Sequence, residues 1–395
     1  MTPTSKSAIA FLLATTAFGA SAQQPQISAA RNPIDVSVDS YLDRLQLPDG
    51  FDVSIYARGM EEARSITMSD NGVLYVGTRG GEGDANIGKV YAIPDANGDG
   101  IGDEVITVID DLYIPNGVAW HDGDLYVAEI GRVLVYRDAD ANLHNMPSPE
   151  VVSDATPETW HHGWKYIDIG PDNKLYVPVG APCNICELED LYGKILRMDL
   201  DGSNLEVFAT GVRNTVGFTW HPETGDLWFT DNGRDVWGDD IPPEELNRAT
   251  GPGQHFGFPH RYGKDLVDNE FPTDMPASAF TPAVLEMPAH NAGLGIEFYT
   301  GEQFPGLYQG QLFAAYHGSW NRNPPAGYKI RLMRFENGTA VSYEDFATGW
   351  LITDPNDSSR LVHWGRPVDL EIAKDGALLV SDDQNGVIYR ISYSD

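Results

Sequence analysis

One short unit recurs six times along this chain, and it constrains the fold more than any other feature. In each copy, a turn containing Gly, Asp or Asn leads directly into a short apolar or aromatic run, as in residues 70–76 and 122–127. Turn residues followed by β-prone residues predict a strand that begins at a tight turn. Each run carries one marker leucine, at position 74, 125, 175, 227, 312 or 378.

The spacing of these leucines indicates how many strands each unit holds. Successive markers are 51, 50, 52, 85 and 66 residues apart. A repeat of this size is typical of a four-stranded propeller blade. The sequence therefore predicts an all-β protein, a six-bladed β-propeller. A two-sheet β-sandwich is the alternative, and the three nearly equal gaps disfavour it.

The N-terminal residues are expected to lie outside the propeller. Residues 1–22 resemble a secretory signal peptide, because Lys6 precedes a short apolar stretch and a small-residue cleavage site ends at Ala22. We therefore expect a secreted, periplasmic protein with an N-terminal lead-in at 23–44 and the propeller at 45–395. No other apolar run reaches the roughly 18 residues that suggest a transmembrane helix, so no integral membrane segment is expected.

The charge of the chain excludes some partners. Asp and Glu total 58 against 26 Lys and Arg, a formal net charge of -32. Such a surface repels nucleic acid and anionic lipid. We expect bound cations and a neutral small-molecule substrate. An anionic ligand would need a local cluster of Arg and Lys.

A polar or cationic residue stands ahead of every marker strand. These residues are Arg64, Asn116, His162 with Lys165, Arg213 with Asn214, His290 with Asn291, and Arg366. The innermost strands of a propeller line its channel, and their starts face one mouth. In so acidic a chain, the recurrence predicts a positive funnel around an anion. For any single residue of this set, a salt bridge between neighbouring blades is the alternative.

The only two cysteines, Cys183 and Cys186, form a Cys-x-x-Cys motif. In a cytosolic βαβ protein this motif suggests a redox site. In an exported all-β chain it instead predicts a disulfide that closes a loop.

An acidic stretch matches the first half of a calcium loop. Oxygen-bearing side chains occupy positions 1, 3 and 5 of that pattern, as Asp95, Asn97 and Asp99. Position 12 is Ile106 rather than Glu, so the stretch is not a full EF-hand. Asp103 or Glu104 could complete the ligand shell. We predict bound Ca²⁺ here, with an acidic surface hairpin as the alternative.

Several motifs in register with the repeats carry a family resemblance. They are residues 161–165 (HHGWK) ahead of 170–172 (GPD), 193–197 (GKILR), 211–214 (GVRN), 256–259 (FGFP), 317–322 (HGSWNR) and 365–368 (GRPV). Together they resemble the soluble quinoprotein glucose/sorbosone dehydrogenases, in particular the sorbosone branch. The resemblance covers about residue 45 to the C-terminus. It implies a propeller that oxidises a sugar or sugar aldehyde with pyrroloquinoline quinone (PQQ) and Ca²⁺, and passes electrons to an acceptor.

The resemblance also implies roles for individual residues. The family's base histidine precedes the Asp of Gly-Pro-Asp by ten residues, which gives His162, with His161 as the alternative. Residues expected around PQQ are Arg64, Lys165, Arg213, Asn214 and Arg366, with Arg322 or Lys329 as the remaining cation. The family's Ca²⁺-binding backbone carbonyls match Gly233 and Arg234, and Arg234 replaces a Pro.

Some positions depart from the family pattern. The Asp that orients the base is replaced by Ala181, and the second arginine near the last blade is replaced by Val368. What orients the base is therefore open. Two other function classes stay open as well: a Ca²⁺-dependent lactonase or esterase propeller, and a non-catalytic propeller that binds a partner protein.

Overall fold

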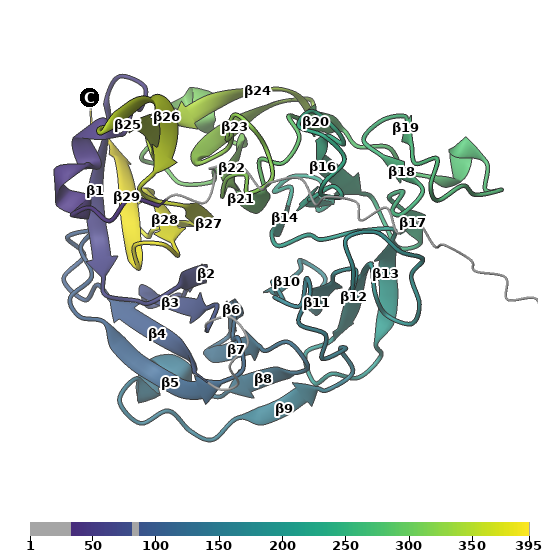
Figure 1. Ribbon diagram of the computed structural model, residues 1–395. Coiled ribbons are helices and arrows are strands. Elements are labelled where there is room, and N and C mark those ends of the chain that lie inside the picture. Colours follow the sequence, from purple (N-terminus) through teal and green to yellow (C-terminus); the bar gives the residue numbers. More distant parts are fainter. Residues whose placement is uncertain (1–32, 81–86, 395) are drawn as a thin grey trace, which may run out of the picture.

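The computed structural model describes residues 33–80 and 87–394, and it confirms the six-bladed β-propeller (Figure 1). Blade 1 contains β2 (Ala63–Met68), β3 (Val73–Thr78), β4 (Gly88–Pro94) and β5 (Ile106–Leu112). Blade 2 contains β6 (Gly117–His121), β7 (Asp124–Ala128), β8 (Val133–Tyr136) and β9 (Glu150–Ser153). Blade 3 contains β10 (Asp168–Ile169), β11 (Lys174–Val179), β12 (Lys194–Asp199) and β13 (Glu206–Thr210), extended by β17 (Gln254–His255).

The remaining blades follow the same antiparallel order. Blade 4 contains β14 (Phe218–Trp220), β15 (Leu227–Asp231), β16 (Glu244–Ala249) and β20 (Leu285–Met287). Blade 5 contains β21 (Gly293–Phe298), β22 (Leu312–Tyr316), β23 (Lys329–Glu336) and β24 (Thr339–Ala347). Blade 6 contains β27 (Pro367–Ile372), β28 (Leu378–Asp382), β29 (Val387–Tyr393) and β1 (Phe51–Arg58).

Every marker leucine lies on the second strand of its blade and is buried. The first strands β2, β6, β10, β14, β21 and β27 lie nearest the central channel (Figure 1). The turn between the first and second strands of each blade therefore produces the sequence repeat. The polar and cationic residues ahead of each marker strand lead into or begin the first strand, which is the innermost one. We call the end of the channel at which these strands begin the mouth.

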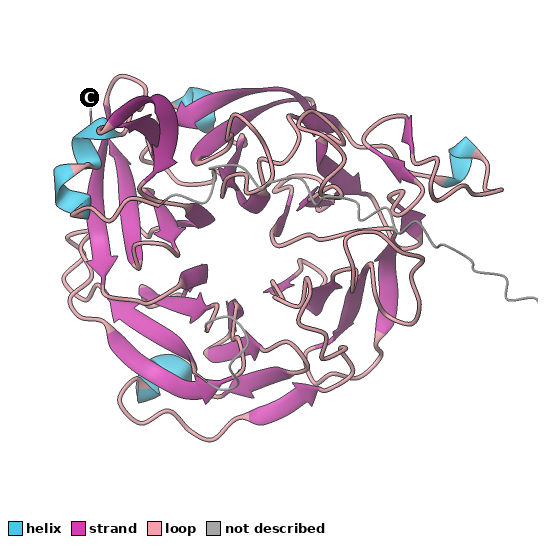
Figure 2. Cartoon of the chain, in the orientation of Figure 1, coloured by secondary structure: helices cyan, strands magenta, loops and turns pink. Residues whose placement is uncertain are grey.

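Two insertions explain the long gaps between markers. One follows β16 and carries the β18 (Arg261–Tyr262) and β19 (Leu266–Val267) hairpin; the other is the β25 (Leu351–Asp354) and β26 (Asp357–His363) hairpin. The described helices are short 3-10 turns at the rim (Figure 2). These are η2 (Val38–Ser40), η3 (Leu42–Arg44), η4 (Ala139–Asn142), η5 (Ala277–Ala279) and η6 (Gly306–Tyr308).

The ring closes by pairing the first strand with the last, which the repeat pattern alone did not indicate. β1 pairs antiparallel with β29 and becomes the outer strand of blade 6. Phe51 begins β1 and packs edge-on against Phe304, Tyr308 and Phe346. Phe51 also packs edge-on against Tyr393 of β29, so hydrogen bonds and aromatic packing together hold the first strand against the last.

The predicted N-terminal segments are only partly visible. The signal peptide at 1–22 lies outside the described residues. In the described part of the lead-in, Val38 and Leu42 pack on the core shared by blades 5 and 6. No helix within 33–80 or 87–394 is long and apolar enough to span a membrane.

Candidate active site

The residues predicted to surround the mouth lie on the innermost strands or in the segments that lead into them. Hydrogen bonds link three of them between blades. Arg64 Nε donates to Asn116 Oδ1 over 3.0 Å, and Asn116 Nδ2 donates to the backbone oxygen of Lys165 over 2.8 Å. All three residues are buried. One polar network therefore runs from blade 1 to blade 3 around the mouth.

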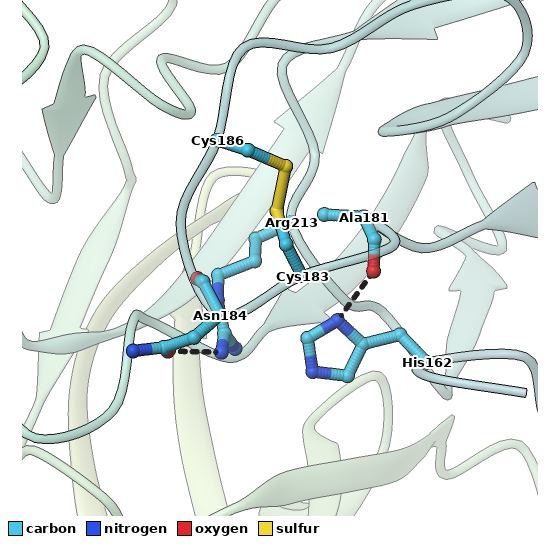
Figure 3. The surroundings of a disulfide bond; sticks show 6 residues. All are labelled: His162, Ala181, Cys183, Asn184, Cys186 and Arg213. Atoms are coloured by element: carbon cyan, nitrogen blue, oxygen red, sulfur yellow. Dashed lines mark hydrogen bonds between the residues drawn. A yellow bond between two sulfur atoms is a disulfide. The ribbon is translucent and has the colours of Figure 1, made fainter.

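His162 is held in the form that a general base requires. Its Nδ1 lies 2.8 Å from the backbone oxygen of Ala181 (Figure 3). A carbonyl only accepts, so Nδ1 carries the hydrogen and Nε2 keeps its lone pair. Burial lowers the pKa of His162 well below its ordinary value, and the charges of Arg213 and His161 lower it further. The imidazole is therefore neutral, and a backbone oxygen fixes its orientation.

The backbone around His162 is unusually tight. His162 has a φ of 51°, in the left-handed region that residues with a Cβ seldom adopt. A Cβ added to Gly180 would lie 2.6 Å from the His162 Cβ and 3.3 Å from Asn214 Oδ1. Glycine at position 180 therefore lets the candidate base approach the start of β14. His161 stacks at a tilt beside it, with ring centroids 4.1 Å apart.

Arg213 and Asn214 are placed by an aspartate at the end of β15. The carboxylate of Asp231 accepts both backbone amides, over 2.8 Å from Arg213 and 2.6 Å from Asn214. The Arg213 guanidinium is itself engaged within the protein. It donates to Asn184 and to the carboxylate of Asp235, with Nη2 3.0 Å from Asp235 Oδ2.

A second charged group lies where blades 1, 5 and 6 meet. Arg64 Nη1 lies 2.9 Å from Asp383 Oδ2, and His317 Nε2 lies 2.9 Å and 3.0 Å from the two oxygens of the same carboxylate. Burial lowers the pKa of His317 to about 3, although its ion-pair geometry with Asp383 favours the protonated form. Because a carboxylate only accepts, the hydrogen of this contact lies on His317 Nε2.

The side chains of two cations at the mouth donate hydrogen bonds to backbone oxygens. Lys165 Nζ donates to the Gly163 oxygen over 2.7 Å, and burial lowers its pKa to about 7. Arg366 donates to the backbone oxygens of His317 and Gly318 over 3.2 Å and 3.1 Å. Among the described residues, neither cation has a carboxylate within ion-pair distance.

These cations fit an anionic ligand such as PQQ. A buried cation without a counterion is costly, and the carboxylate of a ligand would supply one for Lys165. Arg366 is half-buried, and its charge already helps to lower the pKa of Asp383. His161 Nε2 is also buried without a hydrogen-bond partner in the described part of the chain. The donor set therefore suits a group rich in carboxylate and carbonyl oxygens.

The two alternative cations lie in ion pairs away from the innermost strands. Arg322 lies 3.1 Å from Asp240, in the loops above blades 4 and 5. Lys329 begins β23, the third strand of blade 5, and lies 2.6 Å from Asp345. Neither is joined to the mouth network by a direct hydrogen bond among the described residues.

The residues predicted to bind Ca²⁺ lie in two separate places. The Gly233 amide donates to Glu244, while the Arg234 side chain pairs with Asp268 over 2.8 Å. The carboxylates of the acidic loop accept hydrogen bonds from that loop's own backbone amides, at Ala96, Gly98, Asp99, Gly100 and Ile101. No group of three His, Cys, Asp or Glu side chains within 33–80 and 87–394 is arranged to hold a metal. The Ca²⁺ assignments remain predictions.

Sequence reasoning missed a group of carboxylates on the innermost strands. Its members are Asp168 on β10, Glu297 on β21, and Asp369 and Glu371 on β27. Burial, with a smaller contribution from the neighbouring carboxylates, raises the pKa of Asp168 to about 7 and that of Glu371 to about 8. The sequence signal for this group is the alternation of Asp369 and Glu371 along β27.

Comparison with known proteins places this geometry in a family. The family model described as "Domain of unknown function (DUF7133)" matches residues 37–318, and a model described as TrAA12-like matches 243–394. An uncharacterized protein of Borreliella burgdorferi is 32% identical over 379 residues, which cover 91% of this chain and 94% of that protein. A pyrroloquinoline quinone-dependent pyranose dehydrogenase of Coprinopsis cinerea is 25% identical over 88% of this chain. The match spans only 54% of that enzyme's length.

Solved structures share the fold. The PQQ domain of the Coprinopsis cinerea pyranose dehydrogenase, in its holo form, superposes with a TM-score of 0.71 at 21% identity, covering 88% of this chain and 97% of that one. A calcium structure of the Trichoderma reesei family AA12 enzyme also gives 0.71 at 21% identity, over 94% and 100% of the two chains. The chain therefore belongs to the DUF7133 family, and its resemblance to the soluble PQQ-dependent sugar dehydrogenases is confirmed.

Proposed function

We propose that this protein is an exported dehydrogenase that uses PQQ and Ca²⁺ to oxidise a sugar or a sugar aldehyde of the sorbosone or aldose type. The observation that carries the proposal is the set of cations at the mouth of a strongly acidic chain. Lys165 and Arg366 have no carboxylate partner among the described residues, and a neutral His162 lies at the same mouth. The PQQ-dependent relatives support the same conclusion.

The cofactor would be held mainly by charge. Arg366 and Lys165 would pair with PQQ carboxylates, since charge-assisted hydrogen bonds are the strong ones. Arg64, Arg213 and Asn214 would surround the quinone. Backbone oxygens suit Ca²⁺, which takes hard oxygen ligands; Gly233 and Arg234 would supply them.

The protein's own chemical task is proton removal. When bound, PQQ with Ca²⁺ supplies the acceptor for the hydride that leaves the sugar carbon. His162 Nε2 accepts the proton of the hydroxyl on that carbon, so a carbon–oxygen double bond forms as the O–H and C–H bonds break. Positioned base catalysis of this kind contributes about 10²–10⁴-fold.

Reconstitution of the exported chain tests the proposal. Residues 23–395 would be mixed with PQQ in the presence and absence of Ca²⁺, and the absorbance of bound PQQ recorded. Aldoses and sorbosone would then be offered with a dye as electron acceptor. We expect saturable PQQ binding and sugar-dependent dye reduction. A protein that hydrolyses lactones without PQQ, or that binds no PQQ at all, would refute the proposal in favour of the two other classes.

A further inference from the structure

The segment at residues 181–186, which carries the disulfide, contacts both the candidate base and Arg213 (Figure 3). The structure joins Cys183 to Cys186. Just ahead of this disulfide, the backbone oxygen of Ala181 accepts a hydrogen bond from His162 Nδ1. The Ala181 amide donates a hydrogen bond to the backbone oxygen of Arg213 over 2.8 Å. The start of the loop is therefore fixed to both functional residues through backbone groups.

Asn184, between the two cysteines, makes four hydrogen bonds to Arg213 and Asp235. Its backbone oxygen accepts Arg213 Nε over 2.9 Å, and its Oδ1 accepts Arg213 Nη2, also over 2.9 Å. The same Oδ1 accepts the amide of Asp235 over 2.7 Å, and Nδ2 donates to the Asp235 oxygen over 3.0 Å. Asn184 therefore uses its whole side-chain amide to hold the loop against blade 4.

Asp235 extends the arrangement to a third loop. Its Oδ2 accepts Arg213 Nη2, while its Oδ1 accepts Asn321 Nδ2, each over 3.0 Å. Loops from blades 3, 4 and 5 are thus joined beside the mouth. A disulfide between residues so close in sequence restricts the unfolded chain only weakly. Its main effect is therefore local: it limits the conformations open to Asn184.

We propose that the disulfide-closed loop, residues 181–186, positions His162 and Arg213 for catalysis, with Asn184 as the positioning residue. This proposal rests on the proposed function. The loop takes over the task of the carboxylate that the family places at position 181. A neutral carbonyl fixes the tautomer of the base, and the Asn184 amide fixes the plane of the guanidinium next to it.

The test compares Asn184→Ala with Asn184→Asp and with a Cys183→Ser/Cys186→Ser double variant. The carboxylate of Asn184→Asp can still accept from Arg213 and from the Asp235 amide, so that variant should recover much of the lost activity. Asn356→Ala is the control, because Asn356 is exposed in the turn between β25 and β26. In holoenzyme, we expect Asn184→Ala and the cysteine variant to lower kcat at least tenfold, while the KM for sugar changes less than threefold.

A second readout needs neither PQQ nor turnover. NMR titration of the His162 ring in cofactor-free protein should show its pKa moving up towards about 6.5 in Asn184→Ala and after reduction by a phosphine. The groups that act on this ring are Arg213 and His161. The proposal is overturned if both the ring titration and the pH profile of kcat stay at wild-type values in these variants. A wild-type protein without dehydrogenase activity would refute the proposed function, yet the titration would still test the positioning.

Discussion

Arg64 and Asp383 form a buried ion pair across the seam of the ring, with Nη1 2.9 Å from Oδ2. Arg64 lies on β2 of blade 1, while Asp383 directly follows β28 of blade 6. His317, directly after β22 of blade 5, contacts the same carboxylate. The mouth is therefore tied together at the seam, where the start and the end of the propeller meet.

Removing one partner of this pair should destabilise the ring. Arg64→Ala leaves the Asp383 carboxylate buried with less compensation, and breaking a buried pair costs about 3–5 kcal/mol. Urea unfolding of the cofactor-free protein measures the loss. An Arg64→Ala/Asp383→Asn double variant should be less destabilised than the sum of its single variants, since no charge is stranded. Additive effects would mean that the pair is not coupled.

A second prediction concerns the base. His162→Ala should bind PQQ normally, because other residues hold the cofactor's charge, while turnover falls by about 10²–10⁴-fold. His161→Ala is the matched control and should be milder. In the wild type, kcat should rise with pH as His162 loses its proton. Because the pKa of His162 is lowered, this rise should already be complete below about pH 6.5. If His161→Ala loses turnover and His162→Ala does not, the two roles are exchanged.

Much of the fold could be predicted because the repeat is local. Leu74 and Leu378 mark equivalent second strands, and the residues ahead of them begin the innermost strands. The pairing of β1 with β29 could not be predicted in this way, because the two strands lie at opposite ends of the chain and neither carries a signal for the other.

The candidate site could be predicted less completely than the fold. The types of residue at the mouth follow from the repeat, as with Arg366. Their partners depend on the path of long loops: nothing in the sequence places Asn184 and Asp235 against Arg213. The sequence therefore leaves open whether Arg213 is free to bind an anion or lies in a salt bridge, whereas in the fold Asn184 and Asp235, from two loops, both bind its guanidinium.

This difference separates Arg213 from Arg366 in a third prediction. Changing either residue to Ala should weaken PQQ binding by about 2–4 kcal/mol, as expected for losing one partner of a buried charge pair. Only Arg213→Ala should also lower the melting temperature of cofactor-free protein, because it leaves Asp235 unpaired. Calorimetric titration and thermal melts give the two readouts. If both variants bind PQQ with normal affinity, the arginines of the positive funnel have a structural role only.

A fourth prediction concerns the acidic loop. If Asp95, Asn97 and Asp99 bind Ca²⁺, a chelator should lower the melting temperature without PQQ present, by mass action on the native state. An Asp95→Ala/Asp99→Ala variant should not respond to the chelator. The hydrogen bonds that this variant loses lie within the loop itself, so the rest of the propeller should still fold. An equal chelator effect in variant and wild type would remove the loop from the Ca²⁺ sites.

The last prediction follows from the carboxylates on the innermost strands. Burial raises the pKa of Glu371 to about 8 and that of Asp168 to about 7, so the folded state keeps protons that the unfolded state releases near pH 4. The stability these protons provide is complete below the unfolded pKa and is lost as pH rises through the folded values. Unfolding free energy should therefore decline between about pH 4 and pH 8. Glu371→Gln, which cannot ionise, should flatten this decline in urea unfolding at several pH values, whereas an exposed control such as Glu336→Gln should not. An unchanged slope in Glu371→Gln would show that the group does not hold its proton in the fold.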